Sequence, residues 1–566
     1  MHKIKNYIKS LRLLFVVTIF VTACDIEPEF YSETIPENFI TSPDNVYAVL
    51  SRPFTHWRWY VGNDRWYLQE LTTDEMTCPQ RGSDWYNGGE YFRLHYHTWT
   101  ADDRFVVNTY NGTTSGIART LEAFEDLSVV DYESFGLTQI DKDDHVSQLR
   151  AMLAYFYMNG LDYFGGMPLY TSTEEGTKPR STDVETFNFI EEILTDVLDK
   201  LKPKENLIPV TNQDGYISQA AGAALLARLY FNAEAYAGKD MYAECAAICK
   251  DIIDGKYGAY ELEEDWIGPH DFDNGVSPEL IWAVPSEYGK LQWDWYYRYF
   301  YPRNTYKYFG LDGPNGYNGF MLTPSRNPVG EIYNYKLGNT YEKFDKQDLR
   351  KKPYRYLGGG KSEGMFLIGL LENPNDPTLS AEGAKEYKGE TLVIVDQVGR
   401  FSEVGSKYPS VASLPSTMAD GEENSGVRLV KSPQTTIDEL DLRYNPDCPV
   451  IRLAEIYYML AECKLRASDK DEAASLINQV RKRNFENNFD PNPVTVSNLD
   501  EYRMLDEWMI EFVGEGRRRT DLIRWNKFIE DSWWDHEPTV EEYKLRFPIP
   551  NTAIAANPKM EQNPGY

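Results

Sequence analysis

The spacing of apolar residues in a few separate segments is the strongest constraint on how this chain folds. In residues 145–164, HVSQLRAMLAYFYMNGLDYF, apolar side chains recur every three or four positions, which is the spacing of one face of an α-helix. The same spacing predicts helices over residues 218–233 and from residue 242 to Gly255. Asp144 and Ser218 precede the first two segments and are predicted to be their N-caps.

Two further predicted helices, residues 450–466 and 470–483, are joined by a tight turn at Ser468 and Asp469. A helix, a tight turn and an Ala-rich second helix resemble a degenerate tetratricopeptide pair. Such pairs stack because each cannot bury its apolar face alone. The predicted fold is therefore mostly α-helical, with a scaffold of tetratricopeptide-like helical pairs.

Long stretches between these helices lack a helical period. Residues 56–112, 262–345 and 353–447 are rich in Gly, Pro, Asn, Asp and aromatic residues. They contain only short strand-like runs such as ELIWAVP, residues 279–285. Loops of this length inside a compact protein tend to carry function. Since no linker separates them from the helices, we expect long irregular loops and a few short strands on one helical body.

The N-terminus has the features of an export signal. Four basic residues precede an apolar run, residues 13–21, which is too short to span a bilayer as a stable helix. Thr22 and Ala23, ahead of Cys24, resemble the lipobox of bacterial lipoproteins. The resemblance implies that Cys24 becomes the mature N-terminus and carries acyl chains, palmitate among them. An ordinary secreted precursor with an incidental cysteine is the alternative.

The charge balance argues against nucleic acid as a ligand. The chain has 58 Lys and Arg against 88 Asp and Glu, a net charge of −30, which becomes −34 without the four basic residues of the signal. Such a surface repels phosphate backbones. An acidic polysaccharide is also disfavoured unless a local basic pocket overrides the global field.

Several motifs, in order along the chain, resemble the SusD/RagB family. After the lipobox these are RAMLAYFYMNGLDYFGGMPL (150–169), RLAEIYYMLAE (452–462), EFVGEGRRRTDLIRW (511–525) and FPIP…NPKMEQNPGY (547–566). The resemblance implies an outer-membrane lipoprotein that binds nutrients, usually glycans, and serves a partner SusC-like TonB-dependent transporter. It also implies a core of four tetratricopeptide-like pairs, an irregular ligand-binding part and no catalysis.

The same resemblance implies a domain organisation and a location. Residues 1–23 would be a lipoprotein signal peptide and residues 24–566 one SusD-like unit. That unit would comprise an N-terminal part with helical repeats, about residues 24–260, and a C-terminal RagB/SusD part, about residues 261–566. The predicted location is the outer membrane, lipid-anchored and facing the cell exterior.

The basic run in the third motif has a structural interpretation. Its four guanidinium groups lie close in sequence to three carboxylates; the residues are Arg517, Arg518, Arg519, Arg524, Glu511, Glu515 and Asp521. Arg pairs with carboxylates in a bidentate geometry that Lys cannot match. We therefore expect an ion-paired helix junction here rather than a phosphate site.

The aromatic content is high, 14% with 41 Tyr, 26 Phe and 13 Trp. A core could absorb many of these rings, but it does not explain why so many Trp and Tyr fall in polar, Gly-rich stretches without a helical period. Sugars are bound by flat aromatic faces together with planar polar groups. Residues 81–91, RGSDWYNGGEY, offer both in a Gly-rich loop. The segment follows QELTTDEM, residues 69–76, which is similar to the family's acidic segment ahead of a binding-loop Trp. The predicted ligand-binding residues of this loop are Arg81, Asp84, Trp85, Tyr86 and Asn87.

A second aromatic segment, residues 292–301, reads QWDWYYRYFY and has seven aromatic residues in ten positions. These rings cannot all face a core whatever the backbone does. The predicted ligand-binding residues are Trp293, Trp295, Tyr296 and Tyr299, with core packing as the alternative for each ring. A third aromatic group, residues 56–67, is assigned mostly to packing.

The sequence gives little support for catalysis or for a metal. No pair of carboxylates stands out as a glycosidase pair. His95 and His97 lack an evident third metal ligand, and Cys245 and Cys249 are expected to be buried thiols. The run 358–362, GGGKS, lacks the first glycine of a phosphate loop. We expect no cofactor, although residues 271–275, DFDNG, leave a structural Ca²⁺ open.

Three functions of different classes therefore remain. The favoured one is a non-enzymatic surface lipoprotein that captures an oligosaccharide and presents it to a transporter. The second is an exported glycoside hydrolase. The third is a helical-repeat lipoprotein that binds a protein or a peptide.

Overall fold

The computed structural model describes residues 39–204, 215–290, 297–313, 316–373 and 376–566. Its contacts divide the chain into residues 1–46 and residues 47–566. Of the first unit, only residues 39–46 are described, so the predicted signal and Cys24 lie outside the described residues.

Helices make up most of the regular structure. The longer ones are α3 (Pro43–Val61), α4 (Asp64–Glu70), α6 (Arg104–Ser128), α7 (Gln139–Phe164), α8 (Asp183–Val197), α9 (Gln219–Phe231), α11 (Tyr242–Ile253), α16 (Leu453–Arg466), α17 (Lys470–Arg481), α18 (Glu501–Phe512) and α19 (Arg518–Arg524). The shorter ones are α5 (Glu90–His95), α10 (Ala233–Ala237), α12 (Tyr297–Phe300), α13 (Thr305–Phe309), α14 (Thr340–Lys343), α15 (Leu440–Arg443) and α20 (Asn551–Ala556).

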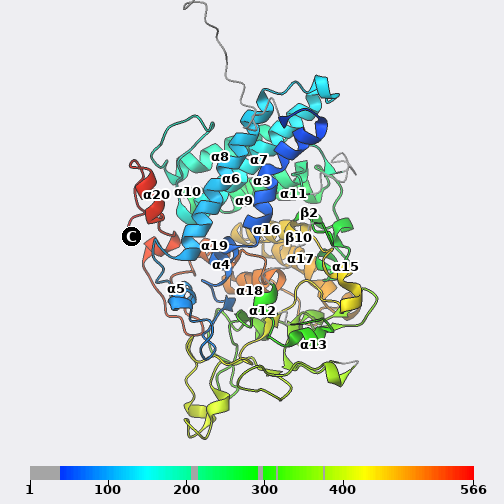
Figure 1. The fold of residues 1–566 in the computed structure, drawn as a ribbon, viewed down its shortest axis with the longest axis vertical. Coiled ribbons are helices and arrows are strands. Elements are labelled where there is room, and N and C mark those ends of the chain that lie inside the picture. Colours follow the sequence, from blue (N-terminus) through cyan, green and yellow to red (C-terminus); the bar gives the residue numbers. More distant parts are fainter. Residues whose placement is uncertain (1–38, 205–214, 291–296, 314–315, 374–375) are drawn as a thin grey trace, which may run out of the picture. The chain divides into compact units, whose positions relative to one another are not determined.

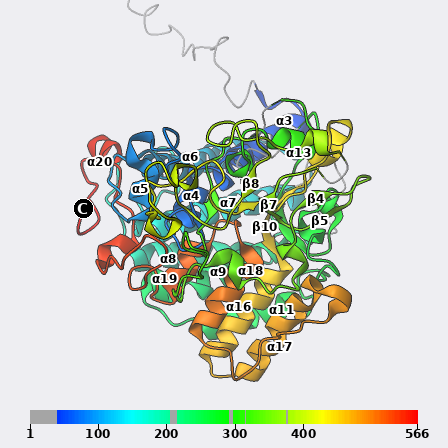
Figure 2. The ribbon, with the colours of Figure 1, turned by 90° about the horizontal axis from the view of Figure 1, so that it is seen from below.

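The long helices pack on one another in chain order. α6 packs on α7, α7 on α8, α8 on α9, α9 on α11, α11 on α16 and α16 on α17 (Figures 1 and 2). Small residues allow close approach: a Cβ added to Gly116 of α6 would lie 2.4 Å from the ring of Phe156 on α7. The predicted scaffold of stacked helices is confirmed.

Two predicted helix ends are confirmed and one is wrong. The Ser218 side chain accepts a hydrogen bond from the Ala221 backbone N–H, and α11 ends just before Gly255, whose φ is +81°. Asp144 is not an N-cap, because α7 begins five residues earlier. Thr138 and Asp141 form a reciprocal capping box there, and it satisfies the first free N–H groups of the helix.

The prediction that residues 56–112 are irregular is wrong. This stretch contains the end of α3, then α4 and α5, and the start of α6. Gly82, Gly88 and Gly89 do lie in turns with positive φ, but Gly112 packs inside α6, where an added Cβ would lie 2.8 Å from the Tyr60 ring. The assignment of rings 56–67 mostly to packing is confirmed, since Trp57, Tyr60, Trp66 and Tyr67 are buried, whereas Trp59 is exposed.

The strands are short and form antiparallel pairs. The pairs are β1 (Met76–Thr77) with β3 (Met321–Leu322), β2 (Leu280–Val284) with β10 (Cys448–Arg452), β4 (Arg355–Tyr356) with β5 (Ser362–Glu363), β6 (Phe366–Leu367) with β9 (Arg428–Leu429), and β7 (Gly369–Leu370) with β8 (Val393–Ile394). The predicted strand at 279–285 is confirmed by β2. The predicted helix at 450–466 begins later, because residues up to Arg452 belong to β10.

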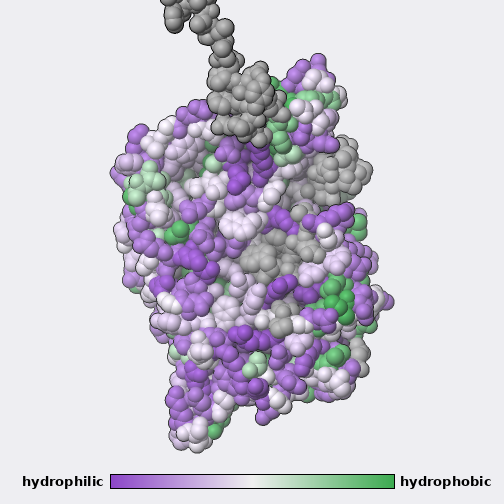
Figure 3. Space-filling model, viewed as in Figure 1, coloured by the Kyte–Doolittle hydropathy of each residue, from purple (hydrophilic) through white to green (hydrophobic). Residues whose placement is uncertain are grey.

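The remaining chain forms the long loops that the composition predicts for residues 262–345 and 353–447. Figure 1 shows the yellow-green part of this region below the helices. The face drawn in Figure 3 is mostly hydrophilic, with small separate apolar areas. Among the described residues, no helix is both long and apolar enough to cross a bilayer.

Candidate ligand-binding site

Two of the predicted site residues, from distant parts of the chain, meet in the folded protein. The ring centroids of Trp85 and Tyr299 are 5.8 Å apart. Tyr317 adds a third ring 5.2 Å from Tyr299. We call Trp85, Tyr299 and Tyr317 the aromatic platform.

The platform is supported from below by buried rings. Phe320 stacks on Tyr299 with ring centroids 4.9 Å apart and planes 12° apart, and Tyr91 packs 5.7 Å from Trp85. Phe320 and Tyr91 are buried, whereas Trp85 and Tyr299 are half-buried and Tyr317 is 47% exposed. The platform therefore presents ring surface to solvent on a rigid base.

Local backbone geometry fixes the Trp85 ring. Arg81 and Asp84 exchange two backbone hydrogen bonds of 2.9 Å, and the turn leaves Trp85 with φ +66°, which is unusual for a bulky residue. The indole Nε1 donates to the Tyr317 carbonyl at 3.0 Å. The ring lies against Gly319, where an added Cβ would be 2.8 Å away.

Arg81 holds this loop from inside. It is only 2% exposed, and its guanidinium donates to the backbone carbonyls of Gly319, Glu422 and Ser425. Burial lowers its pKa to about 10. Contact between Arg81 and a ligand remains a prediction, and in this structure the guanidinium ties the loop to two neighbouring segments.

Asp84 lies at the edge of the platform. Its Oδ2 accepts from Arg303 Nη2 at 2.7 Å and from Lys385 Nζ. Partial burial raises the pKa of this carboxyl, but the two cations outweigh that effect and hold the pKa below its usual range. Asp84 is therefore ionised at neutral pH and can accept hydroxyl hydrogen bonds.

The other predicted residues are exposed or lie outside the described part. Tyr86 is 52% exposed and packs edge-on against Phe92. Asn87 is exposed, and its Nδ2 donates to Glu90 at 3.2 Å. Trp293, Trp295 and Tyr296 lie outside the described residues.

The sequence interpretation missed three residues that contact Trp85 or Asp84: Tyr317, Arg303 and Lys385. Tyr317 lies in a Gly- and Asn-rich run, residues 313–319, so the reasoning that selected residues 81–91 applies equally to it. Arg303 and Lys385 could not be selected from the sequence, because their contact with Asp84 depends on the fold.

The acidic segment 69–76 is structural. Glu70 and Glu75 accept from the backbone N–H groups of Gly516 and Gly514, at 2.6 and 2.7 Å. Burial raises the pKa of both carboxyls, and the charge of Glu70 raises that of Glu75 further. The segment thus anchors the turn between α18 and α19, and its last residue, Met76, begins β1.

The Arg-rich motif forms an ion-paired junction, as predicted, but with partly different partners. Arg517 pairs with Asp521 at 3.0 Å, Arg524 with Glu462 at 2.7 Å, and Arg518 with Asp74 at 2.7 Å. Arg519 pairs with Asp162 at 3.2 Å. These pairs link α19 to α16, to α7 and to the acidic segment.

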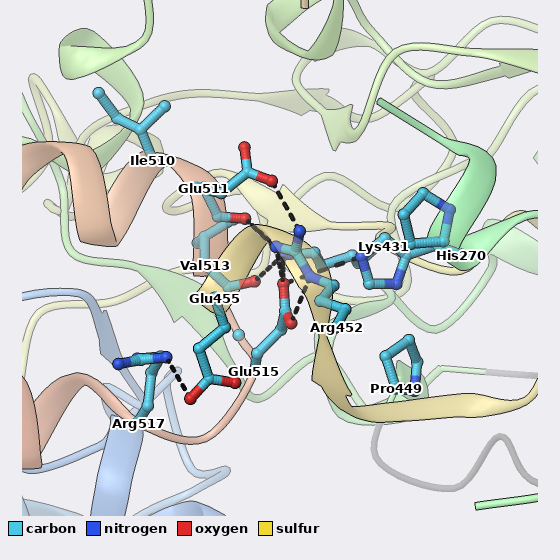
Figure 4. A network of polar contacts seen from close by, with 12 residues as sticks. His270, Lys431, Pro449, Arg452, Glu455, Ile510, Glu511, Val513, Glu515 and Arg517 are labelled. Carbon is cyan, nitrogen blue, oxygen red and sulfur yellow. Dashed lines mark hydrogen bonds and ion pairs between the residues drawn. The ribbon is translucent and has the colours of Figure 1, made fainter. Parts of the chain in front are cut away.

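Glu511 and Glu515 pair instead with basic residues outside the motif. Figure 4 shows Arg452 between these two carboxylates, at 2.7 and 2.8 Å. Lys431 also contacts Glu515, and Arg483 contacts Glu511. Against the cost of burial, these cations hold the pKa of both carboxyls far below the usual range. This group of ion pairs has a structural role, since each of its side chains is buried or nearly buried.

A cavity of about 120 Å³ lies beside this junction. Trp66, Arg228, Glu455 and Tyr155 line it. Arg228 and Glu455 pair with each other, and the buried Tyr155 hydroxyl has no hydrogen-bond partner among the described residues. Since a water needs about 10–15 Å³ of such space, the cavity suits a cluster of ordered waters.

The remaining candidate residues have structural surroundings. His95 and His97 are buried, and burial lowers their pKa values to about 4 and about 3. Cys245 and Cys249 are buried thiols, as expected. Asn274 bonds the Asp447 backbone. Within the described residues, no group of three or more His, Cys, Asp or Glu could hold a metal ion.

A scaffold of stacked helical pairs that carries an aromatic surface on long loops defines the class as a helical-repeat protein. A model of the SusD family matches residues 278–566, and the chain belongs to this family. The chain is 24% identical over 453 residues to the starch-binding protein SusD of Bacteroides thetaiotaomicron, covering 76% of this chain and 74% of that protein.

Solved structures share the fold. A SusD superfamily protein from Parabacteroides distasonis superposes with a TM-score of 0.65 at 19% identity, covering 92% of this chain and 99% of that one. The surface glycan-binding protein A of Bacteroides uniformis gives a TM-score of 0.65 at 17% identity, with 92% and 99% covered.

Proposed function

We propose that this chain binds an oligosaccharide on the aromatic platform at the cell surface and delivers it to a SusC-like TonB-dependent transporter. The observation that carries the proposal is the meeting of Trp85 and Tyr299, 5.8 Å apart, with part of both rings exposed. The names of two relatives, a starch-binding and a surface glycan-binding protein, support it.

The chemistry of the platform suits a sugar. A pyranose covers one ring face with its C–H side, about 40–80 Å², which contributes roughly 1–2 kcal/mol. Asp84 supplies an acceptor for hydroxyl groups at the ring edge. Two or three rings, less the cost of ordering the ligand, give dissociation constants of order millimolar to micromolar. Affinities of that size favour capture and release.

The proposed action is binding without catalysis. A glycosidase needs one carboxylic acid that stays protonated to donate to the leaving oxygen. Asp84, the carboxylate beside the platform, has a lowered pKa because of Arg303 and Lys385. It is a poor general acid for that reason. Released reducing ends from a glycan panel would support the hydrolase alternative.

The proposed location follows from the family and from the N-terminal sequence. Cys24 would carry the lipid anchor, and the outer membrane would hold both this chain and its transporter. Co-purification of a TonB-dependent transporter with the membrane-extracted protein tests the partnership.

Calorimetry on the protein extracted from membranes in detergent, against a panel of polysaccharides, tests the binding. Trp85→Ala removes one platform ring, and we expect it to lower glycan affinity about tenfold. Trp59→Ala is the matched control, because Trp59 is an exposed Trp on α3 outside the platform. Peptide binding that survives Trp85→Ala, with no glycan bound, would favour the peptide-binding alternative.

A further inference from the structure

Three charged side chains from three segments meet beside the platform. Asp84 comes from the Trp85 turn, Arg303 precedes α13, and Lys385 lies between β7 and β8. A single carboxylate oxygen, Asp84 Oδ2, accepts from both cations. The group of Asp84, Arg303 and Lys385, which we call the cationic edge, therefore carries one net positive charge.

The two cations retain donors that face solvent. The side chain of Arg303 is 44% exposed and that of Lys385 34% exposed. Among the described residues, the bond to Asp84 is the only hydrogen bond from the Arg303 guanidinium, which has five N–H groups. Most donors of the edge are thus available to a ligand.

Among the described residues, Asp84 is the only carboxylate that is ion-paired with Arg303 or Lys385, and the neighbouring carboxylates contact other groups. Glu423 accepts from the backbone N–H groups of residues 384, 385 and 387, which also fixes Lys385. The charge of Glu386 raises the pKa of the buried Arg81. Glu382 lies 3.9 Å from Lys307.

The edge is close enough to the rings to act on the same ligand. Asp84 and Trp85 are consecutive, so their Cα atoms are about 3.8 Å apart. A pyranose stacked on Trp85 projects its ring substituents sideways, beyond the rim of the indole. A carboxylate on such a sugar matches the planar fork of an Arg guanidinium.

We propose that the ligand of the platform is a glycan whose sugars carry carboxylates, bound through Arg303 and Lys385. This inference rests on the proposed function and names its substrate class. The net charge of −30 opposes an anionic ligand at long range, but salt at physiological strength screens exposed charges beyond about 8 Å. At contact distance the net positive charge of the cationic edge outweighs the distant negative charges and attracts the carboxylate.

The test compares pairs of oligosaccharides that differ chiefly in the carboxylate. Suitable pairs are oligogalacturonides with galacto-oligosaccharides, glucuronoxylan with xylan oligosaccharides, and sialyllactose with lactose. Affinities are measured by calorimetry on the full protein in detergent. We expect the carboxylate-bearing member of at least one pair to bind tenfold or more tightly than its neutral partner, with the ratio falling in 0.5 M NaCl.

Variants assign the effect to the edge. Arg303→Gln is expected to lower affinity for the anionic member about tenfold, and more than for the neutral member. Lys307→Gln is the matched control, since it removes the same charge nearby without touching Asp84. Equal or tighter binding of neutral glycans in every pair overturns this inference and leaves the proposed function standing. Binding of no glycan overturns both.

Discussion

At the scale of single residues, the platform depends on positions that carry no ring. Gly319 has no side chain, and the Trp85 indole occupies the space where one would be. The Arg81 guanidinium donates to buried backbone carbonyls and does not lie at the surface. The geometry of the rings is therefore set by a glycine and a buried arginine beneath them.

Gly319→Ala tests this dependence. A Cβ would lie 2.8 Å from the Trp85 ring, so the ring must move away from its packed position. We expect glycan affinity to fall several-fold or more and the Trp85 fluorescence to change. Gly176→Ala, where an added Cβ meets nothing within 4 Å, serves as the control. Unchanged affinity in Gly319→Ala would show that the ring position is unimportant.

His95 makes stability depend on pH. Its pKa is about 4 in the folded protein because of burial, against about 6.5 when unfolded. The unfolded state binds the proton more tightly, so acidification below pH 6.5 removes stability down to pH 4.

The comparison with His95→Gln isolates this residue, since other titrating groups are common to both proteins. Denaturant unfolding should show the stability difference between the two proteins changing by about 2 kcal/mol between pH 7 and pH 5, in favour of the variant at low pH. A constant difference over that range would mean that His95 titrates alike in both states.

At the scale of elements, the junction of α18 and α19 is held by charge. Glu511 contacts Arg452, Arg483 and Arg350 in the interior. Removing one partner of a buried pair leaves an uncompensated charge, which costs about 3–5 kcal/mol.

Glu511→Gln should therefore lower the free energy of unfolding by about 3 kcal/mol or more. Glu287→Gln is the control, because its pair with Lys290 is solvent-exposed and worth about 1 kcal/mol or less. Denaturant titration of the two variants compares them directly. Equal losses would argue that the buried network contributes no more than a surface pair.

Sequence patterns predicted elements where the apolar face was regular. α7, α9, α11, α16 and α17 were predicted from their spacing, with errors at their ends such as Asp144. The helices within 56–112 were missed because composition alone suggests a turn at a glycine, whereas Gly112 lies inside α6 and packs against the Tyr60 ring. Of the site, the Trp85 and Tyr299 clusters could be selected from aromatic density. Their contact and the partners of Asp84 depend on tertiary structure.

At the scale of the whole molecule, the proposed membrane location requires an anchor for a chain with a net charge of −30. No helix within the described residues is suited to crossing a bilayer. Acyl chains on Cys24 would hold it instead: each buried CH₂ contributes about 0.8 kcal/mol, and several chains anchor a protein stably where one does so only reversibly.

Cys24→Ser removes the acylated thiol, so we expect the protein to move from the membrane pellet to the soluble fraction after export. The folded part should be unaffected, because the change lies outside residues 47–566, and glycan affinity in solution should match that of the parent protein. Cys448→Ser, at a partly exposed cysteine elsewhere in the chain, should leave the protein in the pellet.

Retention of Cys24→Ser at the membrane would contradict lipid anchoring. If it persisted after a high-salt wash, attachment through another segment would have to replace the lipid. Release by salt alone would point instead to charge contacts with a membrane partner, which an acidic protein of this kind can make only with a basic surface.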